Sequence, residues 1–131
     1  MQAAVEAVNC LDVKSIQELK ALGKPPQQAK EVCFAVMILK EGVLKNHTWS
    51  DVQKMMKNPR KFIQEIQAFD GNNIDAKRIK AVRPHLSQDW FNFEVMKGKS
   101  VAAAYLCAWV VNTVSYNTIY KKIKPLQDAA D

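Results

Sequence analysis

Lysine side chains occur in pairs on three separate short segments of this 131-residue chain. The pairs are Lys14 and Lys20, Lys54 and Lys57, and Lys97 and Lys99. Ammonium groups attract carboxylates and phosphates, so a surface that gathers these pairs would bind an acidic partner. The excess of 19 Lys and Arg over 13 Asp and Glu, a formal net charge of +6, agrees with such a partner without naming it. Nucleic acid, a membrane surface and an acidic protein all remain open at this point.

A second basic set competes for the same role. It consists of Lys77, Arg78, Lys80 and Arg83, which follow the turn sequence DGNN at 70–73. Charges on a helix face most often do no more than keep that face in water. Residue types alone therefore do not decide between a shared binding face and ordinary solvated surfaces.

Residues that could perform catalysis are few and scattered. His47 and His85 are far apart in the sequence, so we predict that both are solvated rather than catalytic. Neither a phosphate-binding loop nor a nucleophile elbow nor a metal-ligand spacing occurs. Cys10, Cys33 and Cys107 are widely spaced within helical apolar patterns, which predicts reduced, buried thiols rather than a disulfide framework. We expect no enzyme activity, no cofactor and no metal in this chain.

The element that must organise these residues is a long helix from Ser100 to about Pro125. Almost every residue from Val101 to Val114 is apolar, and a helix that is apolar on all sides is a buried one. Beyond Tyr116 a single apolar stripe remains. The stripe consists of Ile119, Ile123 and Leu126 beside Tyr120. We expect this helix to pass through a core and then leave it, where it needs one partner helix.

Residues 1–11 supply that partner, because Ala4, Val8 and Leu11 follow the three-and-four spacing of a coiled-coil seam. Chain start and chain end would then lie side by side and antiparallel. We predict the end of an incoming stalk helix at 1–11, a globular head at 12–111 and the start of an outgoing stalk helix at 112–131.

The first part of the head predicts two helices with clear ends. Asp12 caps a short helix whose apolar side runs to Leu22. Pro25 and Pro26 suit the first turn of the second helix, where a missing amide hydrogen costs nothing. This second helix is apolar over VCFAVMIL and ends at Gly42, so it is the second core helix.

Polar caps predict the remaining helices of the head. Thr48, Asn58 and Asp75 each precede a short apolar stripe, and Pro84 is expected to end or kink the last of these helices early. The larger aromatic residues fall within the stripes and are assigned to packing: Trp49, Trp90, Trp109, Phe62 and Phe69. No segment alternates with a period of two. The fold class is therefore all-α, a small bundle of about six short helices at the tip of an antiparallel coiled-coil stalk.

Membrane attachment is not expected. No apolar run reaches the roughly 20 residues that cross a bilayer, and the N-terminus lacks the basic start and apolar region of a signal peptide. We expect a soluble, intracellular domain.

A series of motifs in a characteristic order runs along the chain. They are VNCLDVKSIQELKALGKPP, the AVMIL helix, TWSDVQKMM, FIQEIQAFDGNNI, KAVRPHL, WFNFEVMKGKS and AAAYLCAWVVNTVSYNTIYKKIKP. Together they resemble the stalk-tip microtubule-binding domain of a dynein heavy chain over essentially the whole chain. The resemblance implies a non-catalytic domain on a stalk whose two helices pair within one chain, with ATP hydrolysis in a distant ring of the same heavy chain.

The resemblance also implies which residues contact the track. In the family, the first short helix, the Trp-bearing short helix and the short helix before the outgoing stalk segment bind between α- and β-tubulin. The matching positions are Lys14, Gln17, Lys20, Lys54, Lys57, Lys97 and Lys99. The six lysines among them are those that occur in pairs. The resemblance further implies that the register of the stalk switches the affinity for the microtubule.

The connection KEGVLKNH at 40–47 is short, whereas some axonemal members of the family carry a long flap there. Contacts made by a flap are therefore not transferred to this chain. The same stretch departs from the cytoplasmic pattern, which favours an axonemal dynein in the cytoskeleton of a cilium or flagellum.

Two other classes of function remain to be weighed. A basic helical nucleic-acid binder would use the helix with Lys77, Arg78 and Lys80, but that helix is short and only Arg78 and Arg83 would read bases strongly. A purely structural coiled-coil spacer would not need a head with a surplus of lysines.

Overall fold

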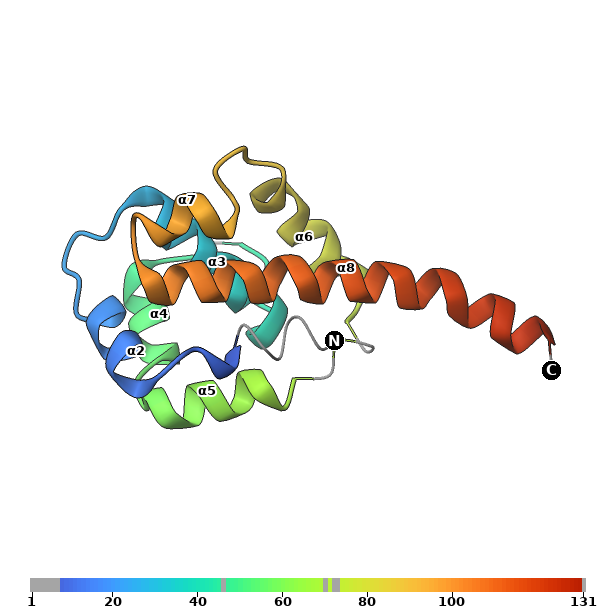
Figure 1. Cartoon of the computed structure of the whole chain (residues 1–131), viewed down its shortest axis with the longest axis horizontal. Helices are drawn as coiled ribbons and strands as arrows, with labels where there is room; N and C mark the ends of the chain where they lie inside the picture. Colours follow the sequence, from blue (N-terminus) through green and yellow to red (C-terminus); the bar gives the residue numbers. More distant parts are fainter. Residues whose placement is uncertain (1–7, 46, 70, 72–73, 131) are drawn as a thin grey trace.

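Seven helices and no strand form within the residues that the structure describes (Figure 1). The computed structural model describes residues 8–45, 47–69, 71 and 74–130. The helices are α2 (Val13–Lys20), α3 (Gln27–Glu41), α4 (Trp49–Met55), α5 (Pro59–Gln67), α6 (Ala76–Leu86), α7 (Phe93–Lys97) and α8 (Val101–Ala130). The predicted all-α class is confirmed. Most of the predicted incoming stalk helix, and all of the DGNN turn except Gly71, lie outside the described residues.

The core forms where α8 crosses α3 (Figure 1). Both helices are apolar on several sides, so each buries side chains against more than one neighbour. The fully buried positions include Val32, Cys33, Val36 and Leu39 on α3 and Ala103, Leu106, Cys107 and Val110 on α8. Val101 is an exception, because it begins α8 at the surface and is 53% exposed. The predicted burial of α8 is therefore correct for residues 102–114, which are buried or half-buried, and wrong for its first residue.

Polar caps begin four of the helices at the predicted positions, and Asn92 caps α7 as well. Each cap is a side-chain oxygen that accepts from a backbone N–H three residues later. The pairs and distances are Asp12 and Ser15 at 2.7 Å, Thr48 and Asp51 at 3.1 Å, Asn58 and Lys61 at 3.2 Å, and Asp75 and Arg78 at 3.0 Å. Gly42 ends α3 with a φ of 74°, a left-handed conformation that other residues adopt at a cost.

The start of α3 and the end of α2 differ from prediction. Pro25 and Pro26 precede the helix, with Pro26 at the capping position and Gln27 as the first helical residue. Leu22 was expected on the apolar side of α2, but α2 ends at Lys20 and Leu22 is 37% exposed. Both differences arise at helix ends, because the apolar pattern does not determine the residue at which a helix begins or ends.

Two helices are longer than their prolines suggested. α6 continues through Pro84 to Leu86, so the expected early end is wrong. Pro84 lies in the last turn, where it removes only the helical bond to the carbonyl of Lys80, and both residues are exposed. The backbone of α8 likewise continues past Pro125 to Ala130.

The three cysteines are free, but they do not share one environment. Cys33 and Cys107 are buried as predicted, and burial raises the pKa of each thiol to about 12. Cys10 is exposed, which corrects the prediction. It lies in a turn between Val8 and Leu11, whose buried side chains occupy the inward direction.

The two histidines are half-buried against α3 rather than solvated, contrary to prediction. The ring of His47 stacks on Phe34 with 5.2 Å between centroids, and its Nε2 lies 2.7 Å from the carbonyl oxygen of Val43. On α6, Nδ1 of His85 lies 3.7 Å from Oε1 of Glu31. Burial lowers the pKa of His85, and nearby His47 adds to that effect, while Glu31 acts in the opposite direction.

Truncation of Trp109 is expected to unfold the head. Trp109 is 1% exposed and its ring makes an edge contact with Phe69 at 5.3 Å. Removal of a buried aromatic side chain costs about 3–5 kcal/mol, a large part of the roughly 5–15 kcal/mol that stabilises a small domain. Trp109→Ala should therefore melt far below the parent in a circular-dichroism scan, whereas Val101→Ala should melt close to it. A folded Trp109→Ala protein with the parent's melting temperature would contradict this packing role.

His85 is expected to destabilise the fold in mild acid. Because its pKa is lowered in the folded chain, the unfolded chain takes up a proton first once the pH falls below about 6.5. The free energy of unfolding then falls with pH until the folded pKa is reached. Urea unfolding at about pH 7.5 and pH 5.5 should show a larger loss for the parent than for His85→Gln. Equal losses would mean that His85 titrates alike in both states.

Candidate functional site

The three lysine-bearing elements meet at one end of the molecule. Figure 1 shows α2, α4 and α7 at the end where α8 begins, while the other end of α8 projects away from the head. We call this region the distal end and define it as α2, α4, α7 and residues 98–100, which connect α7 to α8. All the site residues proposed from the sequence lie on it or directly beside it: Lys14, Gln17, Lys20, Lys54, Lys57, Lys97 and Lys99.

Side chains join α2 to α4 by polar contacts with backbone carbonyls. Lys20 Nζ donates to the carbonyl of Lys57 at 3.1 Å, and Gln53 Nε2 donates to the carbonyl of Lys20 at 2.8 Å. The indole N–H of Trp49 donates to the carbonyl of Leu22 at 2.8 Å. These bonds hold the two lysine-bearing helices together. The ammonium group of Lys20 is thus engaged within the head.

A groove of about 230 Å³ lies between α2 and the start of α8. Lys99 and Val101 line it from one side and Glu18 and Leu22 from the other, so Lys99 lies near α2. Leu22 and Val101 are exposed apolar residues at a site that sequence reasoning described only by its charges. No sequence signal identified them, because both were expected on buried helix faces.

A second groove of about 560 Å³ lies where α4 leads into α5. Lys54, Lys57 and Lys61 line it, together with Glu65 on α5. Sequence reasoning missed Lys61. Lys61 is four residues from Lys57, a spacing that places two side chains on the same face of one helix. The helix boundary at Asn58 and Pro59 lies between them, however, and indicated that the chain changes direction there.

Most of the distal lysines are free to bind. The side chains of Lys14, Lys54, Lys57, Lys97 and Lys99 are exposed, and none of them forms an ion pair with another residue of the described part of the chain. Buried neighbours anchor their helices: Ile16 and Leu19 on α2, Val52 on α4 and Met96 on α7. The distal end therefore presents solvated positive charge on helices that the core holds in place.

The second basic set lies elsewhere and is partly structural. It belongs to α6, which packs on α3 and lies beside α8 (Figure 1). Nη1 of Arg78 donates to the carbonyl of Leu39 at 2.8 Å, and Nε of Arg78 lies 3.8 Å from Asp75. Lys77, Lys80 and Arg83 are exposed. The structure thus separates the two basic sets instead of combining them into one surface.

The described residues contain neither a metal-binding cluster nor a membrane-spanning helix. Within residues 8–45, 47–69, 71 and 74–130, no three His, Cys, Asp or Glu side chains are grouped so that they could hold a metal ion. No helix in these ranges is long and apolar enough to cross a membrane.

Comparison with known proteins identifies the family. The whole chain, residues 1–131, matches the family described as the microtubule-binding stalk of dynein motor. It is 35% identical over 126 residues to the dynein alpha chain of the flagellar outer arm of Chlamydomonas reinhardtii, covering 93% of this chain and 3% of that protein. It is 34% identical over 132 residues to dynein axonemal heavy chain 9 of Homo sapiens, covering 98% of this chain and 3% of that protein.

A solved structure described as the microtubule binding domain of dynein-C has the same fold. It superposes with a TM-score of 0.79 at 28% sequence identity, covering 95% of this chain and 86% of the other. The chain spans about 3% of the length of the curated relatives it matches. The family resemblance seen in the sequence motifs is confirmed, and this chain belongs to the family of microtubule-binding stalks of dynein motors.

Proposed function

We propose that this chain is the microtubule-binding tip of an axonemal dynein heavy chain and that it binds the acidic surface of α/β-tubulin through the distal end. The observation that carries the proposal is the set of exposed lysines at the end opposite the projecting part of α8, which form no ion pair within the described part of the chain. The relatives are named as flagellar outer arm and axonemal chains, which supports a place in the axonemal cytoskeleton. In the parent heavy chain, ATP hydrolysis would take place outside this non-catalytic segment.

The contact residues are assigned by exposure and by what each side chain already binds. Lys14 and Gln17 lie on the outer side of α2, and Lys54 lies on the outer side of α4. We assign these three residues, with Lys57, Lys97 and Lys99, to direct contact. Lys20 has a different role, since its ammonium group binds the carbonyl of Lys57 and holds α2 against α4.

Binding of this kind is a sum of weak charge interactions. An exposed ion pair contributes about 0.2–1 kcal/mol, so several lysines must act together to hold the track. Such pairs are screened over about 8 Å at physiological ionic strength. The affinity should therefore fall steeply as salt is added. Leu22 and Val101 at the groove beside Lys99 would add a smaller, salt-insensitive apolar part.

Nucleic-acid binding has no comparable support. The matched family is a microtubule-binding one, and Arg78, one of the two arginines available for reading bases, is bound to the carbonyl of Leu39.

Reversal of single distal charges is expected to weaken microtubule binding without loss of stability. Lys14→Glu and Lys54→Glu each change the net charge by two units at an exposed side chain, and each should lower the affinity by about tenfold in co-sedimentation assays. Lys77→Glu is the matched control, since Lys77 is equally exposed but lies on α6. All three variants should melt like the parent. If the control weakens binding as much as the distal variants, or the distal variants sediment like the parent, the site is misassigned.

We further propose that residues 1–11 and 112–131 are the two helices of a stalk that pair within the same chain, with the head between them at 12–111. Ile119 is 54% exposed on α8, as expected of an apolar residue that needs a partner helix. On the head side, α8 is held by its buried half and by Asn117, whose Nδ2 donates to the carbonyl of Gly71 at 2.9 Å. The incoming segment continues through Asp12 directly into α2.

This connectivity implies that sliding of one stalk helix along the other is transmitted to α2. A half-heptad shift moves one helix along the other by roughly 5 Å, which is far more than a close-packed core absorbs smoothly. Since α8 is anchored, the displacement would reach Lys14, Gln17 and Lys20. Two discrete arrangements of the distal end are the expected result, and the microtubule would select the one it binds better.

Locking the stalk at different registers is expected to change microtubule affinity. Cysteine pairs would be placed at successive registers between residues 1–11 and 112–126, in a background where the exposed Cys10 is replaced by serine. Each oxidised protein should bind microtubules with its own affinity, and reduction should restore one common value. Equal affinity at every register, in folded proteins with complete disulfides, would mean that the distal end does not respond to the stalk.

A further inference from the structure

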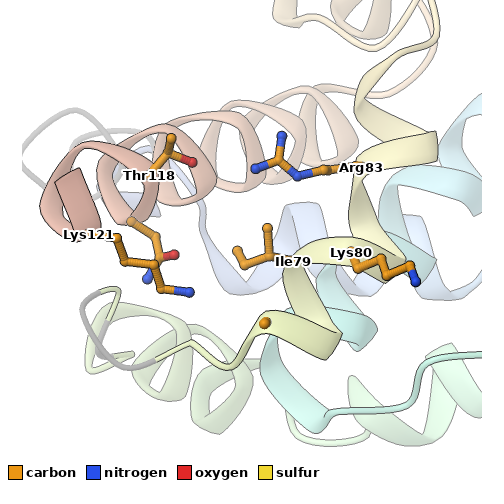
Figure 2. Close-up of a pocket in the computed structure, with 7 residues that line it drawn as sticks. Ile79, Lys80, Arg83, Thr118 and Lys121 are labelled. Atoms are coloured by element: carbon orange, nitrogen blue, oxygen red, sulfur yellow. The ribbon is translucent and has the colours of Figure 1, made fainter.

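A groove of about 450 Å³ lies between α6 and the middle of α8, apart from the distal end (Figure 2). Ile79, Lys80 and Arg83 line it from α6, and Thr118 and Lys121 line it from α8. Figure 2 shows Arg83 extending from α6 toward Thr118, with Ile79 between the two helices. Nothing in the proposed microtubule contact uses these residues.

Among the described residues, the charges that line this groove are all positive. Lys80, Arg83 and Lys121 are exposed, and no acidic side chain of the described residues lines the groove or pairs with them. Two described carboxylates pair with residues of α6 other than those that line the groove: Asp75 faces Arg78, and Glu31 faces His85. In Figure 2 the ammonium group of Lys80 points away from the groove, whereas Arg83 and Lys121 lie on its two sides. These two cations repel each other, so a bound anion would relieve that repulsion.

The lining is not only charged. Ile79 is 7% exposed and, with Ala76, gives the groove an apolar floor. The hydroxyl of Thr118 donates to the carbonyl of Val114 at 2.9 Å, so its hydrogen is already used. The groove thus combines an apolar strip with cations on both of the helices that form it.

The groove also stays open when the stalk is paired, a point that rests on the proposed pairing of the stalk. Successive residues of a helix are about 100° apart, which puts Thr118 and Lys121 on nearly the opposite side of α8 from Ile119 and Tyr116. A partner helix that covers Ile119 would therefore leave the groove accessible.

We propose that this groove binds an acidic, extended peptide segment of a partner protein. Carboxylates of the peptide would lie on Arg83 and Lys121, and one apolar side chain would contact Ile79. Basic clusters recognise acidic motifs in this way, and the volume is that of a site for a few side chains. A nucleic acid would instead need a continuous basic track and would gain little from the apolar floor.

The test uses the 131-residue chain and a fluorescein-labelled peptide of about six glutamates around one leucine, followed by fluorescence anisotropy at two salt concentrations. The double variant Arg83→Glu, Lys121→Glu should weaken peptide binding by at least about tenfold and leave co-sedimentation with microtubules unchanged. Lys97→Glu, Lys99→Glu is the matched control, because it changes the net charge equally at exposed positions of the distal end. It should leave peptide binding intact.

A variant with unchanged net charge distinguishes binding of the peptide in the groove from general electrostatic attraction of an acidic peptide to a basic protein. Ala76 is exposed and lines the groove, so Ala76→Trp should fill it and weaken peptide binding while the protein remains folded. The proposal is overturned if the peptide does not bind the parent, if both double variants weaken it equally, or if Ala76→Trp binds it like the parent. It is also overturned if duplex DNA at equal charge concentration displaces the peptide as well as unlabelled peptide does.

Discussion

Burial of the first half of α8 against α3 is the interaction on which the other helices of the head depend. Isolated helices shorter than about 12–15 residues are marginal in water, and α2, α4, α5, α6 and α7 have between 5 and 11 residues each. α7 shows the dependence most clearly, because Met96 is its one fully buried side chain and the ring of Phe93 packs on Tyr105 of α8. The short helices are stable because they cover two long apolar ones.

The same arrangement explains why the proposed binding residues sit on short helices. A short helix with one or two buried side chains has most of its surface free for charge, as Lys14 and Gln17 on α2 illustrate. The contacts between α2 and α4 are hydrogen bonds from side chains to backbone carbonyls at the edge of the head. Such contacts can rearrange at lower cost than buried apolar packing. The position of α2 relative to α4, two of the elements proposed to meet the track, can therefore change more easily than the packing of the core.

The helix caps and the two buried core helices were predictable from the sequence, whereas helix ends and the exposure of individual residues were less so. The caps at Asp12, Thr48, Asn58 and Asp75 were correct, because each depends on residues within one turn. The predictions that Cys10, Leu22 and Val101 are buried and that the histidines are solvated were wrong. The exposure of each of these residues depends on which neighbour covers a helix end or a loop. For the site, sequence pattern and family resemblance indicated the three elements, but not that the structure would bring Lys61, Leu22 and Val101 beside them.

The buried hydrogen bond from Asn117 to the carbonyl of Gly71 also has a mechanical meaning. Asn117 is the last buried residue of α8 among those whose side chains are described, and it ties the helix to the loop before α6. The helix continues for 13 residues to Ala130, or about 20 Å at 1.5 Å per residue. This part of α8 is thus a rod that is fixed at one end, at Asn117. Its bending stiffness determines how much of a force on the stalk bends the helix and how much moves the helix along its axis.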